Sequence, residues 1–193
     1  ITYLEDGDWA VISSSEVTVR DNRGTIVKRP IQTTEISGAL SGKEGYAHFM
    51  LKEIFEQPRV IGDTLHSFIN PSDQSVTLPD LPFDLLNLPK ITISACGTAF
   101  YAALTAKYWF EKIACIPVEV DIASELRYRN MILPDKGLSI FISQSGETAD
   151  TLAALRHCRK RNQRTLSIVN VPESTIARES DAVLQTYAGP EIG

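Results

Sequence analysis

From residue 90 onward, short apolar stretches alternate with longer stretches in which apolar and polar residues are interspersed. The short stretches predict buried strands at 91–95, 118–122, 138–143, 165–170 and 182–185. The stretches between them predict helices at 100–113, 124–129, 149–161 and 175–179. Alternation of strand and helix indicates a parallel sheet covered by helices on both faces, an α/β fold of the doubly wound type. Ligands of such sheets bind beyond the carboxyl ends of the strands.

The pattern of the first 30 residues is typical of short antiparallel strands. The pattern predicts strands at 9–12, 17–20 and 25–28, and residues 21–24 have the composition of a hairpin loop between the last two. Three strands of this length cannot form an independent core. We therefore expect residues 1–30 to close a domain whose main part is missing from this chain.

A polar connector at residues 31–45, which contains glycine and serine, predicts a domain boundary. A helix is predicted at 46–57, with its end imposed by Pro58, and a second helix at 59–69. Four prolines make the stretch up to residue 89 rich in loops. The expected organisation is thus a closing strand segment at 1–30, a linker at 31–45, linker helices at 46–89 and an α/β domain at 90–193.

Composition and charge exclude several classes of protein. The net charge of −5 argues against nucleic-acid binding, and the basic run at 156–161 is expected at a helix end, where cations complement the helix dipole. No stretch approaches the ~20 consecutive apolar residues of a membrane span. The three cysteines have neither disulfide nor metal-ligand spacing, as expected in a reducing cytosol. We expect a cytoplasmic protein without a metal or another cofactor.

The residues that carry chemistry follow the predicted strand at 138–143. They are Ser143, Gln144, Ser145, Gly146 and Thr148, and a predicted helix begins directly after them. The first backbone N–H groups of a helix lack internal partners and carry partial positive charge. Together with the hydroxyls they predict a phosphate site that needs no lysine or arginine. In the alternative interpretation, Ser145 and Thr148 are only a helix N-cap and its neighbour in the first turn.

A similar turn, Cys96-Gly97-Thr98-Ala99, follows the predicted strand at 91–95. Two such turns at one edge of a sheet favour an anionic ligand with many hydroxyl groups. Cys96 also suggests a nucleophile, because a helix N-terminus lowers a thiol pKa. None of the three histidines is near it in sequence, so a small residue beside the ligand is the preferred interpretation.

Glu191 follows the last predicted strand, also at the carboxyl edge of the sheet. A carboxylate at that place is suited to act as a general base beside a sugar carbon. It is equally suited to cap a following helix. The sequence leaves both roles open.

Several stretches together resemble the glutamine–fructose-6-phosphate aminotransferases, or glucosamine-6-phosphate synthases. The run Ser-Gln-Ser-Gly-Glu-Thr-Ala-Asp-Thr-Leu at 143–152 is the most specific of them. The segment at 43–58 resembles the linker helix of that family, and residues 3–8 resemble the closing strands of its glutaminase domain. Further similar stretches lie at 95–98, 122–125, 127–129 and 178–181.

The resemblance implies a glutaminase domain with the N-terminal nucleophile hydrolase fold, followed by two sugar isomerase (SIS) domains. Members of the family transfer ammonia from glutamine to fructose 6-phosphate and isomerise the product to glucosamine 6-phosphate. Carried over to this chain, Ser143, Gln144, Ser145 and Thr148 would hold the phosphate. The side of the sugar would be lined by Cys96, Gly97 and Thr98. Members often have a serine at the position of Ala99, so a hydroxyl contact from that position is not expected.

The resemblance also implies a partial chain, because the cysteine nucleophile of the glutaminase domain and the second SIS domain are absent. We expect the 193 residues alone to be inactive and the complete protein to be a homodimer, with glutamine bound by the missing domain and no nucleic acid or membrane as partner. Two alternatives remain: a regulator that senses sugar phosphates through a SIS domain, and a stand-alone sugar-phosphate isomerase or deglycase. The acidic, strand-forming residues 1–30 argue against both.

Overall fold

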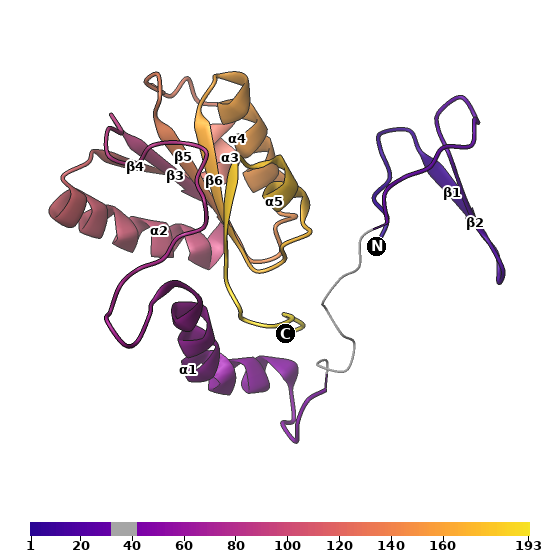
Figure 1. Cartoon of the computed structure of the whole chain (residues 1–193), viewed down its shortest axis with the longest axis horizontal. Coiled ribbons are helices and arrows are strands. Elements are labelled where there is room, and N and C mark those ends of the chain that lie inside the picture. The colour runs from indigo at the N-terminus through magenta and orange to yellow at the C-terminus, as the bar shows by residue number, and fades with distance from the viewer. Residues whose placement is uncertain (32–41) are drawn as a thin grey trace. The chain divides into compact units, whose positions relative to one another are not determined.

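The computed structural model describes residues 1–31 and 42–193, which belong to two compact units, Ile1–Ser41 and Gly42–Gly193 (Figure 1). In the first unit, β1 (Trp9–Ile12) pairs antiparallel with β2 (Val17–Arg20), as predicted. The third predicted strand, at 25–28, is wrong, since this segment forms only an isolated bridge between Ile26 and Arg20. The Asp21 carboxylate accepts hydrogen bonds from the backbone N–H groups of Arg23 and Thr25 and holds a compact turn instead.

The predicted end of a helix at Pro58 is also wrong. A single helix, α1 (Phe49–Phe68), includes Pro58 and replaces the two helices expected at 46–57 and 59–69. Proline removes one backbone donor from a helix interior and bends the helix, which Figure 1 shows as a change of direction along α1. Ion pairs between side chains one turn apart span α1 on both sides of the bend: Lys52 with Glu56, and Arg59 with Asp63.

The second unit is built around a five-stranded parallel sheet of strand order β4-β3-β5-β6-β7. The α/β fold class predicted from the alternation of strands and helices is confirmed. Four strands have the predicted bounds, and the fifth, β6, begins one residue earlier than predicted. The strands are β3 (Ile91–Ala95), β4 (Val118–Ile122), β5 (Leu138–Ser143), β6 (Arg164–Val169) and β7 (Ala182–Gln185).

Helices cover both faces of this sheet, with α2 on one side and α4 and α5 on the other (Figure 1). The helix α2 (Gly97–Trp109) begins three residues earlier than predicted and continues as a π-helical turn, η2 (Phe110–Ala114). The remaining helices are α3 (Ala123–Leu126), α4 (Ala149–Lys160) and α5 (Thr175–Glu179). The prediction for α3 was too long, because the backbone N–H groups of Tyr128 and Arg129 both donate to the Glu125 carbonyl and form a turn.

Two apolar clusters hold these layers together. Under α2, Ile91 and Ile93 of β3 pack with Leu138 and Ile140 of β5. On the opposite face Phe141 of β5 packs against residues of α3, α4 and α5, among them Leu126, Leu155 and Ile176. Because side chains alternate between the faces of a strand, β5, β6 and β7 supply side chains to both clusters, whereas β3 supplies Ile91 and Ile93 to the first. The carboxyl ends of β3 and β5 are thereby fixed side by side.

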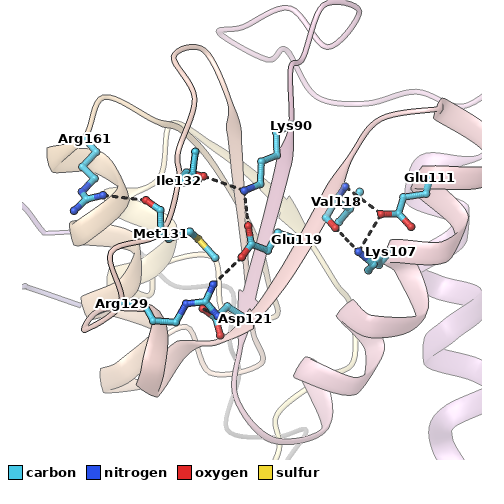
Figure 2. A network of polar contacts seen from close by, with 10 residues as sticks. All are labelled: Lys90, Lys107, Glu111, Val118, Glu119, Asp121, Arg129, Met131, Ile132 and Arg161. Atoms are coloured by element: carbon cyan, nitrogen blue, oxygen red, sulfur yellow. Dashed lines mark hydrogen bonds and ion pairs between the residues drawn. The ribbon is translucent and has the colours of Figure 1, made fainter.

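A network of charged side chains lies along the edge strand β4 (Figure 2). Glu119 accepts hydrogen bonds from Lys90 and from the Arg129 Nη2 atom, the latter at 2.8 Å. The Arg129 Nη1 atom lies 3.3 Å from the Asp121 Oδ2 atom. The hydrogen bond from Lys90 and the charges of Lys90 and Arg129 lower the pKa of the Glu119 carboxyl below its usual range. The network ties β4 to the loop after α3, since Lys90 also donates to the Ile132 carbonyl.

No helix within residues 1–31 and 42–193 is both long and apolar enough to cross a membrane. The basic run at 156–161 lies at the end of α4, where it was expected, and Arg159 and Lys160 stand in its last turn. Arg156 pairs with Glu179 of α5, and Arg161 donates to the Met131 carbonyl (Figure 2). Two cations of the basic run, Arg156 and Arg161, are thus used in contacts within the fold.

Candidate functional site

The site is built where β3 and β5 end, side by side. Ala95 and Ile142 are partners in the register of the two parallel strands, so the turns that follow leave the same edge of the sheet. Gly97 opens α2 with a φ of +57°, and Gly146 lies in the second turn with a φ of +65°. Glycine adopts this left-handed backbone without steric cost. Both turns therefore lead directly into a helix whose N-terminus lies at the carboxyl edge.

The turn between β5 and α4, residues 143–148, is ordered by its own hydroxyl groups. The Ser143 Oγ atom accepts a hydrogen bond from the Gly146 N–H at 3.0 Å and lies 3.0 Å from the Thr148 Oγ1 atom. The Ser145 Oγ atom accepts from the Glu147 N–H at 3.2 Å. Thr148 is the N-cap residue of α4, yet its side chain makes no capping hydrogen bond. The N-cap is thus Thr148, and not Ser145 as the alternative interpretation has it.

A second turn, residues 170–176, donates hydrogen bonds to the first turn and so stabilises it. The Gln144 carbonyl accepts from the Asn170 N–H at 3.1 Å, and the Gly146 carbonyl accepts from the Ile176 N–H at 3.0 Å. The Glu147 carboxylate accepts from the Thr175 N–H at 2.7 Å and so caps the start of α5. The carboxylate of Glu147 is thus used in holding the turn. Sequence analysis missed these supports, because their partners lie 26 or more residues away.

A cavity of about 280 Å³ opens between the two turns. This volume lies close to the lower end of the range for small-molecule sites. All eight residues proposed from the sequence line it, and Ala99 and Ile142 complete the lining: Cys96, Gly97, Thr98, Ser143, Gln144, Ser145, Thr148 and Glu191. The fold therefore brings together residues that were selected from three separate segments. Whether each contacts a ligand remains a prediction.

The cavity is suited to an anion that is bound by dipolar groups, namely hydroxyls and backbone N–H groups at helix N-termini. Among the residues that the structure describes, no lysine, arginine or histidine lines the cavity, and Glu191 is the one carboxylate in the lining. The acidic residue in the first turn of α4, Asp150, pairs with Arg127 at 3.2 Å. A dianion between the turns would be met by hydroxyls and by the N-terminal N–H groups of α2 and α4. No group of metal-ligating side chains was found among the described residues.

Cys96 is the N-cap residue of α2 and is half-buried. The Thr151 hydroxyl lies 3.9 Å from its sulfur atom. Among the described residues no histidine lines the cavity, so the partner that commonly activates a nucleophilic thiol is not found beside Cys96. This arrangement favours the interpretation of Cys96 as a small residue beside the ligand.

Known proteins resemble the chain along its whole length. It is 52% identical over 193 residues to a glutamine–fructose-6-phosphate aminotransferase of Zymomonas mobilis, covering all of this chain and 32% of that protein. It is 55% identical to one of Bradyrhizobium diazoefficiens, with the same two coverages. The resemblance drawn from the sequence motifs is confirmed. The chain spans about a third of the length of these curated relatives.

Solved structures agree with the fold. The C-terminal domain of glucosamine-fructose-6-phosphate aminotransferase from Francisella tularensis superimposes with a TM-score of 0.71 at 45% identity, covering 79% of this chain and 43% of that one. A glucosamine-6-phosphate deaminase from Thermotoga maritima gives a TM-score of 0.59 at 28% identity, covering 72% of this chain and 40% of that one. The SIS domain family model matches residues 84–193, more than half of the sequence. The chain belongs to the SIS domain family.

Proposed function

We propose that the chain is part of a glutamine–fructose-6-phosphate aminotransferase and that its SIS domain binds the sugar phosphate. The observation that carries this proposal is the cavity between two helix N-termini, lined by hydroxyl and amide side chains and free of cationic side chains. Relatives with that name cover the full chain at 50–55% identity. The complete protein would convert fructose 6-phosphate and glutamine into glucosamine 6-phosphate and glutamate.

The phosphate would lie on the turn that follows β5, bound by Ser143, Gln144, Ser145 and Thr148. A phosphate there would accept hydrogen bonds from these side chains and from the first N–H groups of α4. The sugar would extend toward Cys96, Gly97 and Thr98, which line the other side of the cavity. Ala99 offers no hydroxyl, so that position would contribute only shape.

Glu191 would act as the general base beside the sugar carbons. It is the carboxylate in the cavity lining, and it reaches the cavity from a segment other than the two turns. Isomerisation of an aminated ketose moves a proton between neighbouring carbons, which requires a base within hydrogen-bond reach. The alternative role, as a cap of a following helix, would leave the carboxylate without a chemical task.

The remaining parts of the proposal concern the complete protein. Residues 1–30 would close a glutaminase domain, 31–45 would be the linker, 46–89 would lead into the SIS domain, and 90–193 would be the first of two SIS domains. Glutamine would be hydrolysed in the glutaminase domain. The assembly would be a cytoplasmic homodimer, and exposed aromatic side chains on α2, Tyr101, Tyr108 and Trp109, offer apolar surface for such an interface.

The test is protection of the intact protein against thermal unfolding by sugars. Fructose 6-phosphate and glucosamine 6-phosphate should raise the melting temperature in a concentration-dependent manner, because ligand binding to the folded state stabilises it. Fructose and glucosamine at equal concentration should have little effect, since they lack the dianion. Equal shifts with fructose and with fructose 6-phosphate would contradict the phosphate site. Isomerisation of sugar phosphate without any use of glutamine would instead favour a stand-alone isomerase.

A further inference from the structure

Glu147 is the one charged residue of the turn at 143–148, and it stands between Ser145 and Thr148, which would both contact the phosphate. A carboxylate in that position opposes the binding of a dianion, because like charges repel each other. Glu147 does not line the cavity, and its carboxylate is hydrogen-bonded to the start of α5 instead. A role other than contact with the ligand therefore has to explain this carboxylate.

The Glu147 carboxylate connects the turn to the N-terminus of α5. Its Oε1 atom accepts a hydrogen bond from the Thr175 N–H at 2.7 Å. Thr175 is the first residue of α5, so its N–H has no acceptor within the helix, and the N-cap residue Ser174 provides no side-chain cap. Hydrogen bonds to an ionised carboxylate are stronger than those between neutral groups. One contact thus satisfies an unpaired donor and ties Glu147 to a residue 28 positions away.

Backbone contacts join the same two turns on the side of the turn that precedes Glu147. The Gly146 carbonyl accepts from the Ile176 N–H, and the Gln144 carbonyl accepts from the Asn170 N–H. These contacts do not depend on side chains, so they persist when Glu147 is substituted. Glu147 adds a side-chain contact that fixes the last part of the turn, directly before α4. It can therefore be removed without removing the rest of the junction.

We propose that Glu147 is a positioning residue that sets the affinity for sugar phosphate by holding the 143–148 turn in its binding conformation. The inference rests on the proposed function, in which this turn binds the phosphate, and it assigns Glu147 no contact with the ligand. The apparent affinity of a site falls in proportion to the fraction of molecules whose site is in the binding conformation. Loss of the contact with Thr175 lowers that fraction, and the phosphate must then order the turn as it binds.

Two substitutions of Glu147 in the intact protein separate the hydrogen bond from the charge. Glu147→Ala removes both, whereas Glu147→Gln removes the charge and keeps an oxygen that accepts from the Thr175 N–H. Glu147→Ala should raise the KM for fructose 6-phosphate by about threefold to tenfold, as expected for one hydrogen bond, and Glu147→Gln should leave it nearly unchanged. The kcat at saturating fructose 6-phosphate should change little in either variant, because the bound phosphate itself orders the turn.

The donor of this hydrogen bond can be removed as well as the acceptor. Thr175→Pro deletes the N–H at the first position of α5, where proline is favoured, and Ser174 already has the extended conformation that precedes proline, with φ −66° and ψ 160°. Thr175→Ala is the matched control, since it removes the hydroxyl that accepts from Arg178 and keeps the N–H. Thr175→Pro should raise the KM about as much as Glu147→Ala does, and Thr175→Ala should not. In the double variant the effects of Glu147→Ala and Thr175→Pro should not add, because both remove the same hydrogen bond.

Hydrogen exchange in the intact protein gives a readout that needs no turnover. Without ligand, the amides at 144–148 should exchange faster in Glu147→Ala and Thr175→Pro than in Glu147→Gln. Glu179→Ala is the control for a general loosening of α5, because Glu179 ties the other end of this helix to Arg156 of α4 and does not line the cavity. It should lower the melting temperature without raising the KM.

The outcomes separate the positioning role from the proposed function. An unchanged or lower KM in Glu147→Ala, or an equal rise in Glu147→Gln, would overturn the positioning role while the proposed function stands. Additive effects of Glu147→Ala and Thr175→Pro, or an equal rise of KM in Glu179→Ala, would overturn it in the same way. Absence of protection by fructose 6-phosphate in the unsubstituted protein would overturn the proposed function and the positioning role with it.

Discussion

Gly146 leaves no room for a side chain in the turn at residues 143–148. Its φ of +65° is a left-handed conformation that costs other residues roughly 1–2 kcal/mol. In addition, a Cβ atom there would lie 1.9 Å from the Ser174 Oγ atom. Ser174 is almost completely buried, so it has little room to withdraw. The turn therefore requires glycine both for its conformation and for the close approach of the 170–176 turn.

We predict that Gly146→Ala lowers the free energy of unfolding by about 2 kcal/mol or more, through the left-handed backbone and the overlap with Ser174. It should also abolish protection by fructose 6-phosphate, because the turn that would hold the phosphate must shift. Chemical denaturation measures the first effect and thermal shift the second. The control is Gly62→Ala in α1, where the space for a Cβ atom is open. That change should raise the free energy of unfolding by about 0.5–1 kcal/mol.

Substitutions at Ser145 and Thr148 test the proposed phosphate contacts directly. Replacing either with alanine should raise the KM for fructose 6-phosphate, because each loses a hydrogen bond to a charged group worth about 1.5–3 kcal/mol, or roughly tenfold to a hundredfold in affinity. Hydrolysis of glutamine alone should be spared. The matched control is Ser139→Ala, since Ser139 lies on β5, the strand that leads into this turn, but is fully buried outside the cavity. An unchanged KM in the Ser145 and Thr148 variants would contradict their role.

At the scale of elements, sequence pattern predicted the strands of the sheet well and the helices less well. Parallel strands are buried on both faces, so they appear as short apolar runs with sharp ends, and the bounds of β3, β4, β5 and β7 were predicted correctly. The failure at Pro58 has a different cause. Local preference favours an end before proline, whereas α1 continues through Pro58, with ion pairs between successive turns on both sides of it.

The candidate site also has a part that could be predicted from the sequence and a part that could not. The residues of its lining stand next to strand ends and could be selected from the sequence, because glycine and hydroxyl residues after an apolar run are a local signal. The residues that support the lining could not, since Asn170 and Glu53 act on backbone groups 18 and 139 residues away. No local pattern distinguishes the asparagine or glutamate that anchors a distant segment from one that is merely solvated.

The charge network at β4 leads to a prediction about pH. The lowered pKa of Glu119 means that its carboxylate stabilises the fold above the ordinary carboxyl pKa of about 4.3, and that this stability is lost as pH falls through the lower folded-state value. Glu119→Gln should lower the free energy of unfolding by about 1 kcal/mol at neutral pH, a small value because the pair is partly exposed to solvent. The difference from the unsubstituted protein should shrink progressively below about pH 4.

Denaturant titrations at pH 7, 5 and 3.5 would measure this dependence. Asp135→Asn is the control, because Asp135 is an exposed carboxylate in the loop before β5. It removes one carboxylate, as Glu119→Gln does, but it should leave the free energy of unfolding nearly unchanged at each pH. A loss in Glu119→Gln that persists unchanged at low pH would show that packing, and not charge, holds this edge of the sheet.

At the scale of the whole molecule, the cavity depends on segments that are far apart in the chain. The two turns lie near residues 96 and 145, and the turn at 170–176 forms hydrogen bonds with the second of them. Glu191 belongs to the segment after β7, whose backbone donates a hydrogen bond to Glu53 of α1. All of these segments belong to the unit Gly42–Gly193. Both apolar clusters of the fold, with the side chains packed against them, also lie between Leu81 and Leu184. The described residues that line and support the candidate site therefore all belong to this unit.

We therefore predict that removal of everything up to residue 41 from the intact protein leaves the SIS domain folded and able to bind sugar phosphate. The melting temperature of that domain should change by no more than about 4 °C, the shift that roughly 1 kcal/mol produces in a domain of this size. Fructose 6-phosphate should raise it as much as in the undeleted protein, because the ligand contacts are preserved. Calorimetry with and without the sugar measures both quantities. A deletion variant that melts without cooperativity, or that melts normally but gains no stability from fructose 6-phosphate, would mean that residues 1–41 complete the site.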